Sequence, residues 1–165
     1  MKKIIFLLCF SLFLSGCNSN EKINDVTASL LLPQEAVAPY LDYTPDITEK
    51  NTRRYSITQY LSNPTGKYDP VIIKIFQSNE LLSEEDILND FNEIKELRSD
   101  SFTVDGMNVD CFVAYPSIHY YTDGYHVQIT AGSGSDNNQK ILLMNLAKIS
   151  LENLNKYKGV LDTDE

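Results

Sequence analysis

The sequence predicts an α+β domain: an antiparallel sheet of about five to six strands with two main helices packed on one face. Several segments rich in β-branched and aromatic residues are joined by short turns, which is typical of antiparallel pairing. Two helical segments, one in the middle and one at the end of the chain, each follow a run of strands. Single strands and single helices therefore do not alternate along the chain, as they would in a parallel sheet.

The N-terminal leader holds Lys2 and Lys3, an apolar run from Ile4 to Leu14, and then Ser15-Gly16-Cys17. A charged start, a short apolar run and small residues before a cleavage point have the form of a secretory signal. The run is too short for a permanent membrane span, because a bilayer core about 30 Å thick needs roughly 20 helical residues.

The tetrapeptide Leu14-Ser15-Gly16-Cys17 resembles the lipobox of bacterial lipoproteins. This resemblance implies that a diacylglyceryl group is attached to Cys17 and that residues 1–16 are removed as a signal peptide. Residues 17–26 would then form a lipidated polar tether on the extracytoplasmic face of the cell membrane. Asn18, rather than Asp, follows the cysteine, which in a cell with two membranes implies the outer membrane. The alternative is an ordinary signal peptide cut near Gly16.

Composition limits the class of partner. Without Lys2 and Lys3 the chain has 12 basic and 23 acidic side chains, a net charge of −11. Nucleic-acid binding is excluded, because it needs clustered basic residues and the only adjacent arginines are Arg53 and Arg54. Residues 27–160 have the length of a single domain, followed by an acidic tail at 161–165.

The first part of the domain contains an ambiguous segment and a hairpin. Residues 28–32 could form a strand, but the prolines that follow interrupt any long element, and we expect a wrapping segment (Pro33, Pro39 and Pro45). Residues 54–60 and 71–76 alternate in polarity or are rich in β-branched residues, and the turn cluster Asn63–Gly66 lies between them. They predict a β-hairpin with a long loop.

The middle helix has a clear start signal. Ser83 is a favoured N-cap, and the acidic residues 84–86 complement the helix dipole. Ile87, Phe91 and Ile94 follow at helical spacing.

The second part of the domain reads as a meander followed by a helix. Residues 101–104, 109–115 and 120–130 predict strands with tight turns at Asp105-Gly106 and Thr122–Gly124. Apolar residues from Ile141 to Leu154 then predict a helix that ends before Gly159.

Three segments carry a family resemblance: Val104-Asp105-Gly106, Tyr121-Thr122-Asp123-Gly124-Tyr125 and Ala147-Lys148-Ile149-Ser150. Their order resembles secreted DUF4367-type domains, which are small lipoprotein or anti-sigma-associated modules. The resemblance covers roughly residues 55–155 and implies a PsbP/Mog1-like fold. It carries over no catalytic residues.

Two constellations could suggest chemistry. Cys111 could act as a nucleophile with His119 or His126 as base and Asp123 as orienter. On an alternating strand, however, Cys111 shares its face with valines, as a buried small hydrophobe would. The two histidines could face each other across a hairpin, but two ligands are too few for a metal site. We therefore predict no catalytic residue, metal or cofactor.

A possible binding face is aromatic. Tyr115, Tyr120, Tyr121 and Tyr125 fall within eleven residues, with His119 among them, and they cannot all point inward. Exposed tyrosines are typical of interfaces and sugar-stacking surfaces. The alternative is that alternate rings lie in the core and the rest are isolated on the surface.

Together these features predict a lipid-anchored, non-enzymatic binding module of the bacterial cell envelope. Its partners would be the membrane, through the lipid on Cys17, and an envelope protein or cell-wall component. The alternatives are an envelope hydrolase that uses Cys111 with a histidine, and a carrier of a small lipid or sugar.

Overall fold

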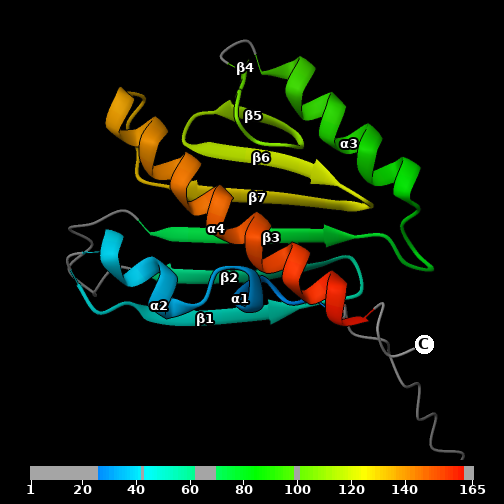
Figure 1. The fold of residues 1–165 in the computed structure, drawn as a ribbon, viewed down its shortest axis with the longest axis horizontal. Coiled ribbons are helices and arrows are strands. Elements are labelled where there is room, and N and C mark those ends of the chain that lie inside the picture. The colour runs from blue at the N-terminus through cyan, green and yellow to red at the C-terminus, as the bar shows by residue number, and fades with distance from the viewer. Residues whose placement is uncertain (1–25, 42, 62–69, 99–100, 162–165) are drawn as a thin grey trace, which may run out of the picture.

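The computed structural model describes residues 26–41, 43–61, 70–98 and 101–161 (Figure 1). The predicted α+β class is confirmed: within these ranges, one antiparallel sheet of seven strands is combined with four α-helices and a short 3₁₀ helix. The leader, nearly all of the tether, the turn at Asn63–Gly66 and the tail from Asp162 lie outside the described residues.

The strands are arranged in the order β1-β2-β3-β7-β6-β5-β4. Their bounds are β1 Asp46–Asn51, β2 Tyr55–Leu61, β3 Val71–Gln77, β4 Phe102–Thr103, β5 Asp110–Ala114, β6 Ser117–Thr122 and β7 Tyr125–Ala131. The predicted hairpin is confirmed as the antiparallel pair β2–β3. The predicted count of five to six strands is too low. Strand β1 was missed because all six of its residues are exposed, so no apolar alternation marks it.

The turn between β6 and β7 explains how residues 117–131 form two strands. Asp123 and Gly124 have φ angles of 45° and 77°. Positive φ at both central residues of a two-residue loop defines the hairpin turn that Asp-Gly favours.

The helices are α1 Ala28–Leu31, α2 Gln34–Val37, the 3₁₀ helix η1 Ala38–Tyr40, α3 Glu84–Leu97 and α4 Asn137–Leu161. Residues 28–32 are therefore mostly helical, and the strand considered for them is wrong. The N-cap prediction is confirmed, because Ser83 and Asp86 form a reciprocal capping box. Helix α4 continues through Gly159, so its predicted end is wrong. No helix in the described part of the chain is long and apolar enough to span a membrane.

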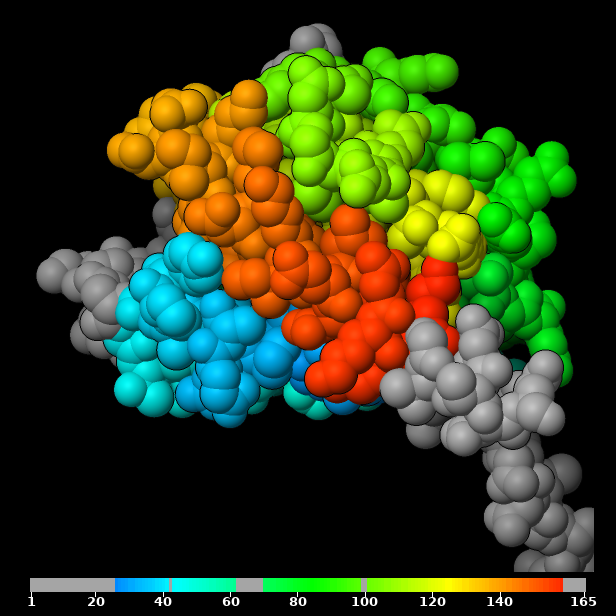
Figure 2. Space-filling model, viewed as in Figure 1, coloured from blue at the N-terminus to red at the C-terminus, as the bar shows by residue number. Residues whose placement is uncertain are grey.

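Helix α4 and the N-terminal helices cover one face of the sheet, which we call the α4 face. In Figure 2, α4 and the N-terminal segment lie side by side over the sheet. The Asn153 amide donates a hydrogen bond to the Leu31 carbonyl oxygen at 3.0 Å. The Tyr120 hydroxyl is 2.7 Å from the Ser150 hydroxyl of α4. Buried apolar residues of the sheet and of α4 form one cluster, so the main hydrophobic core lies between the sheet and α4.

Helix α3 packs on the opposite face, which we call the α3 face. The Phe91 ring of α3 lies 5.1 Å from the Phe112 ring of β5. Phe112 is paired with His119, whereas its neighbour Cys111 is paired with Tyr120, so these two pairs point to opposite faces. The prediction that both main helices pack on one face is therefore wrong. Strand β5 has buried residues on both faces, so a helix must pack on each face of the sheet at this strand.

Helix α3 covers only part of its face. It packs against β7, β6 and the neighbouring part of β3, while no described helix covers β1 and β2 on this side. In β2, residues that face α1 are buried and residues that alternate with them are half-exposed. We call the uncovered surface the open half-face; the residues that line it are Thr48, Glu49, Lys50, Tyr55, Ile57, Gln59 and Lys74.

Candidate functional site

Cys111 lies in the core of the α4 face. Its exposed fraction is 1%, and it is paired with Tyr120 on β6. Burial, with a smaller contribution from the charge of Asp110, raises the pKa of the Cys111 thiol to about 12. The thiol is therefore protonated at neutral pH and has no open path to a substrate.

His119 and His126 lie on the opposite face of the sheet from Cys111. The Nδ1 atom of His119 is 3.1 Å from the Nε2 atom of His126, so the expectation that these rings face each other is confirmed. Asp123 is exposed in the β6–β7 turn, where its carboxylate accepts a hydrogen bond from Lys158. The thiol, the imidazoles and the carboxylate therefore do not form one constellation.

The histidine pair is part of a stack of aromatic rings. His119 lies parallel to Phe112 with ring centroids 4.7 Å apart, and His126 stacks on Phe76 at 5.4 Å. Phe91 meets the His126 ring edge-on at 5.3 Å. These apolar neighbours leave each imidazole with the other as its hydrogen-bond partner, so one ring donates and the other accepts.

Burial lowers the pKa of both imidazoles. The pKa of His119 is about 4, because of burial and then the charge of Arg98. The pKa of His126 is about 3, because of burial, then His119 and then Lys74. Both rings are therefore neutral at pH 7. Across the described ranges, no group of three or more His, Cys, Asp or Glu side chains could hold a metal ion.

Two members of the predicted aromatic face are buried. Tyr120 is 0% exposed and its hydroxyl is satisfied by Ser150, while His119 is 3% exposed. These two residues cannot contact a partner, which corrects the predicted face. The strands carry them into the two cores, one on each side of the sheet.

The other three members of the predicted face are half-buried. The Tyr121 hydroxyl donates to the Glu84 carboxylate at 3.0 Å, and Tyr115 packs against Phe102 at 5.8 Å. Lys158 lies 5.8 Å from the centre of the Tyr125 ring. Their contacts are mostly within the fold, and a binding role for these three tyrosines stays a prediction.

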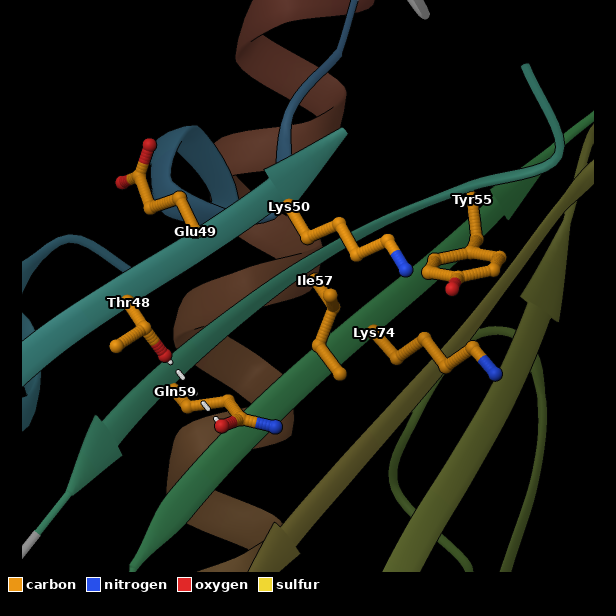
Figure 3. A pocket seen from close by; sticks show the side chains of 7 residues that line it. All are labelled: Thr48, Glu49, Lys50, Tyr55, Ile57, Gln59 and Lys74. Carbon is orange, nitrogen blue, oxygen red and sulfur yellow. Dashed lines mark hydrogen bonds between the residues drawn. The ribbon is translucent and has the colours of Figure 1, made fainter. Parts of the chain in front are cut away.

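The open half-face contains a depression of about 380 Å³ (Figure 3). Lys50 comes from β1, Tyr55, Ile57 and Gln59 from β2, and Lys74 from β3. Pairing of Lys50 with Ile57, and of Ile57 with Lys74, sets the two lysines on either side of an apolar floor. The depression is thus built on rigid strands rather than on loops.

The two lysines converge on one aromatic ring. The Nζ atom of Lys74 is 4.6 Å from the Tyr55 ring centre and 4.5 Å from the Phe76 ring centre, and that of Lys50 is 6.0 Å from Tyr55. In Figure 3 the Glu49 carboxylate points away from both. Among the described residues, neither lysine has a carboxylate within salt-bridge distance. Both ammonium groups can therefore receive an anion.

The alternation in β2 could have identified which of its residues share a face, but not which face is open. That depends on where α3 lies, which local patterns do not encode.

Comparison of this chain with protein-family models, curated proteins and solved structures finds no match.

Proposed function

We propose that this chain is a lipid-anchored, non-enzymatic binding module of the bacterial cell envelope, and that it holds its partner on the open half-face. The observation that carries this proposal is the uncovered depression between Lys50 and Lys74. The lipobox-like segment ending at Cys17 supports the extracytoplasmic location. The order of strands and helices supports a likeness to PsbP/Mog1-like, DUF4367-type domains.

The hydrolase and the carrier, the two alternative functions, differ in how well the structure fits them. A hydrolase would need Cys111 beside His119 or His126, and the sheet separates them. A carrier of a small lipid or sugar would need a site of suitable size, and the depression on the open half-face provides one. The carrier therefore remains the second candidate, and it would use the same surface.

The anchor is tested by Cys17→Ser. Because the lipid would be attached to this thiol, we expect the variant to move from the membrane fraction to the soluble extracytoplasmic fraction and to lose incorporation of labelled fatty acid. Cys9→Ser, within the leader, is the matched control and should keep both properties. A Cys17→Ser protein that stays labelled and membrane-bound would contradict the proposed anchor.

The open half-face is tested by site-specific crosslinking in intact cells. Gln59→Cys presents a thiol in the depression, whereas Lys148→Cys presents one on the exposed side of α4. With a thiol-linked photocrosslinker, we expect a discrete adduct from Gln59→Cys alone. The wild-type chain should remain unlabelled, because Cys111 is buried.

The other possible crosslinking results discriminate between the proposed binding surface and its alternatives. Equal adducts from both variants, or an adduct from Lys148→Cys only, would place the interface elsewhere. Fast labelling of Cys111 in the folded wild-type protein would instead support the hydrolase.

A further inference from the structure

The charge of the open half-face is opposite to that of the whole chain. The chain has a formal net charge of −9, yet the residues that line the depression carry two positive charges, on Lys50 and Lys74, and one negative charge, on Glu49. Arg53 and Arg54 are exposed in the turn between β1 and β2, next to Tyr55. A local cationic surface on an acidic protein favours an anionic ligand.

The two lysines also match a particular anion. A phosphate monoester carries about −1.5 to −2 charges at pH 7 and has three strong acceptor oxygens. Lysine is a common phosphate ligand and binds it as a point charge, without the bidentate geometry of arginine. Lys50 and Lys74 together provide two positive charges beside the same ring, while the carboxylate of Glu49, which also lines the depression, points away from both lysines (Figure 3).

The other residues that line the depression suit the hydroxyl-bearing part of a ligand. Thr48 and Gln59 are joined by a 3.4 Å hydrogen bond at the exposed end of the depression, and such a weak contact can be exchanged for ligand hydroxyls. Ile57 supplies a single apolar floor. A peptide would need several buried apolar or aromatic anchors to bind here, and the depression offers none of that depth. Its volume of about 380 Å³ is that of a small-molecule site.

We propose that the open half-face binds a phosphorylated sugar or polyol, with Lys50 and Lys74 on the phosphate and with Gln59 and Thr48 on the hydroxyl groups. This inference rests on the proposed function, because it names the ligand class of the same surface. A free metabolite and one unit of an envelope polymer present the same phosphate and hydroxyl groups, and the competition experiment below distinguishes them.

The test is ligand-observed saturation-transfer NMR with the mature lipidated protein in deuterated detergent. Glucose 6-phosphate is the probe, glucose is its neutral control, and inorganic phosphate is the competitor. We expect saturable transfer to glucose 6-phosphate, none to glucose, and displacement by excess phosphate. A short glycerol phosphate oligomer should compete more strongly than glucose 6-phosphate if the source is a polymer, and equally or less if it is a free metabolite.

Two variants with the same change in net charge locate the effect. Lys50→Gln/Lys74→Gln should weaken binding of glucose 6-phosphate at least tenfold. Lys148→Gln/Lys156→Gln removes two exposed lysines from α4 and should leave the affinity within twofold. Equal unfolding midpoints in urea establish that both variants are folded.

Several outcomes would overturn the ligand class. These are absence of transfer to glucose 6-phosphate, equal weakening by both double variants, or binding only of phosphatidylglycerol vesicles or of a glutamate-rich peptide. If the Gln59→Cys adduct forms but glucose 6-phosphate does not bind, the binding module stands and this ligand class fails. If neither is observed, both proposals fail.

Discussion

Replacement of Phe91 by Ala is expected to lower the free energy of unfolding by about 3–5 kcal/mol, the usual range for removing a buried aromatic ring. Phe91 is 0% exposed and lies at the centre of the contact between α3 and the sheet. Its ring is 5.1 Å from Phe112, 5.3 Å from His126 and 5.9 Å from Tyr121. The cavity left by the substitution would be bounded by sheet residues that cannot move together to fill it.

Leu97→Ala is the matched control, because it truncates another apolar residue of α3. Leu97 is 74% exposed, so its loss should change the unfolding free energy by no more than about 0.5 kcal/mol. Urea unfolding followed by circular dichroism measures both. A similar, small effect of the two substitutions would mean that α3 is not held to the sheet through Phe91.

Acidification below pH 6.5 is expected to destabilise the domain through the histidine pair. In the unfolded chain both imidazoles bind protons with a pKa near 6.5, whereas in the folded domain burial lowers the pKa of His119 to about 4 and that of His126 to about 3. Between these values the unfolded state binds more protons. The stability that both neutral rings provide above pH 6.5 is therefore lost as the pH falls toward the folded pKa values.

The size of this effect follows from linkage. Each histidine can contribute about 1.4 kcal/mol per pH unit, so the unfolding free energy should fall by about 2–4 kcal/mol between pH 7 and pH 5. Urea unfolding at pH 7, 6 and 5 measures the loss. His126→Gln removes one of the only two histidines, and we expect it to reduce the slope by roughly half.

Imidazole NMR resonances provide a check that does not depend on stability. In the folded domain neither ring should titrate between pH 8 and pH 5.5. Two ordinary titrations near pH 6.5 would contradict the burial of the pair, and a flat dependence of stability on pH would contradict the linkage.

Local patterns predicted the elements whose signal lies within a few neighbouring residues. The N-cap at Ser83 and the hairpin of β2 and β3 are examples, because capping and alternation are local properties. Strand β1 lacked such a signal. Its six residues are all exposed, and only pairing with β2 identifies it as a strand.

The candidate site was less accessible to sequence reasoning than the fold. The tyrosines and histidines of residues 115–126 were conspicuous because they are close in the sequence, but the fold carries Tyr120 and His119 into separate cores. Lys50 and Lys74 are far apart in the sequence, and no motif links them. They meet beside Tyr55 because β1, β2 and β3 are neighbours in the sheet.

The sequence by itself determined the α+β class, the start of α3 and the hairpin of β2 and β3, because propensity, capping and alternation act over short distances. It also contains the lipobox-like segment from which the anchor is predicted. Only the tertiary structure decided that α3 and α4 lie on opposite faces, that Cys111 is separated from the histidines, and that no helix in the described part of the chain covers one half of the α3 face. These properties depend on which elements cover which side of the sheet, and that is set by packing between segments distant in the chain.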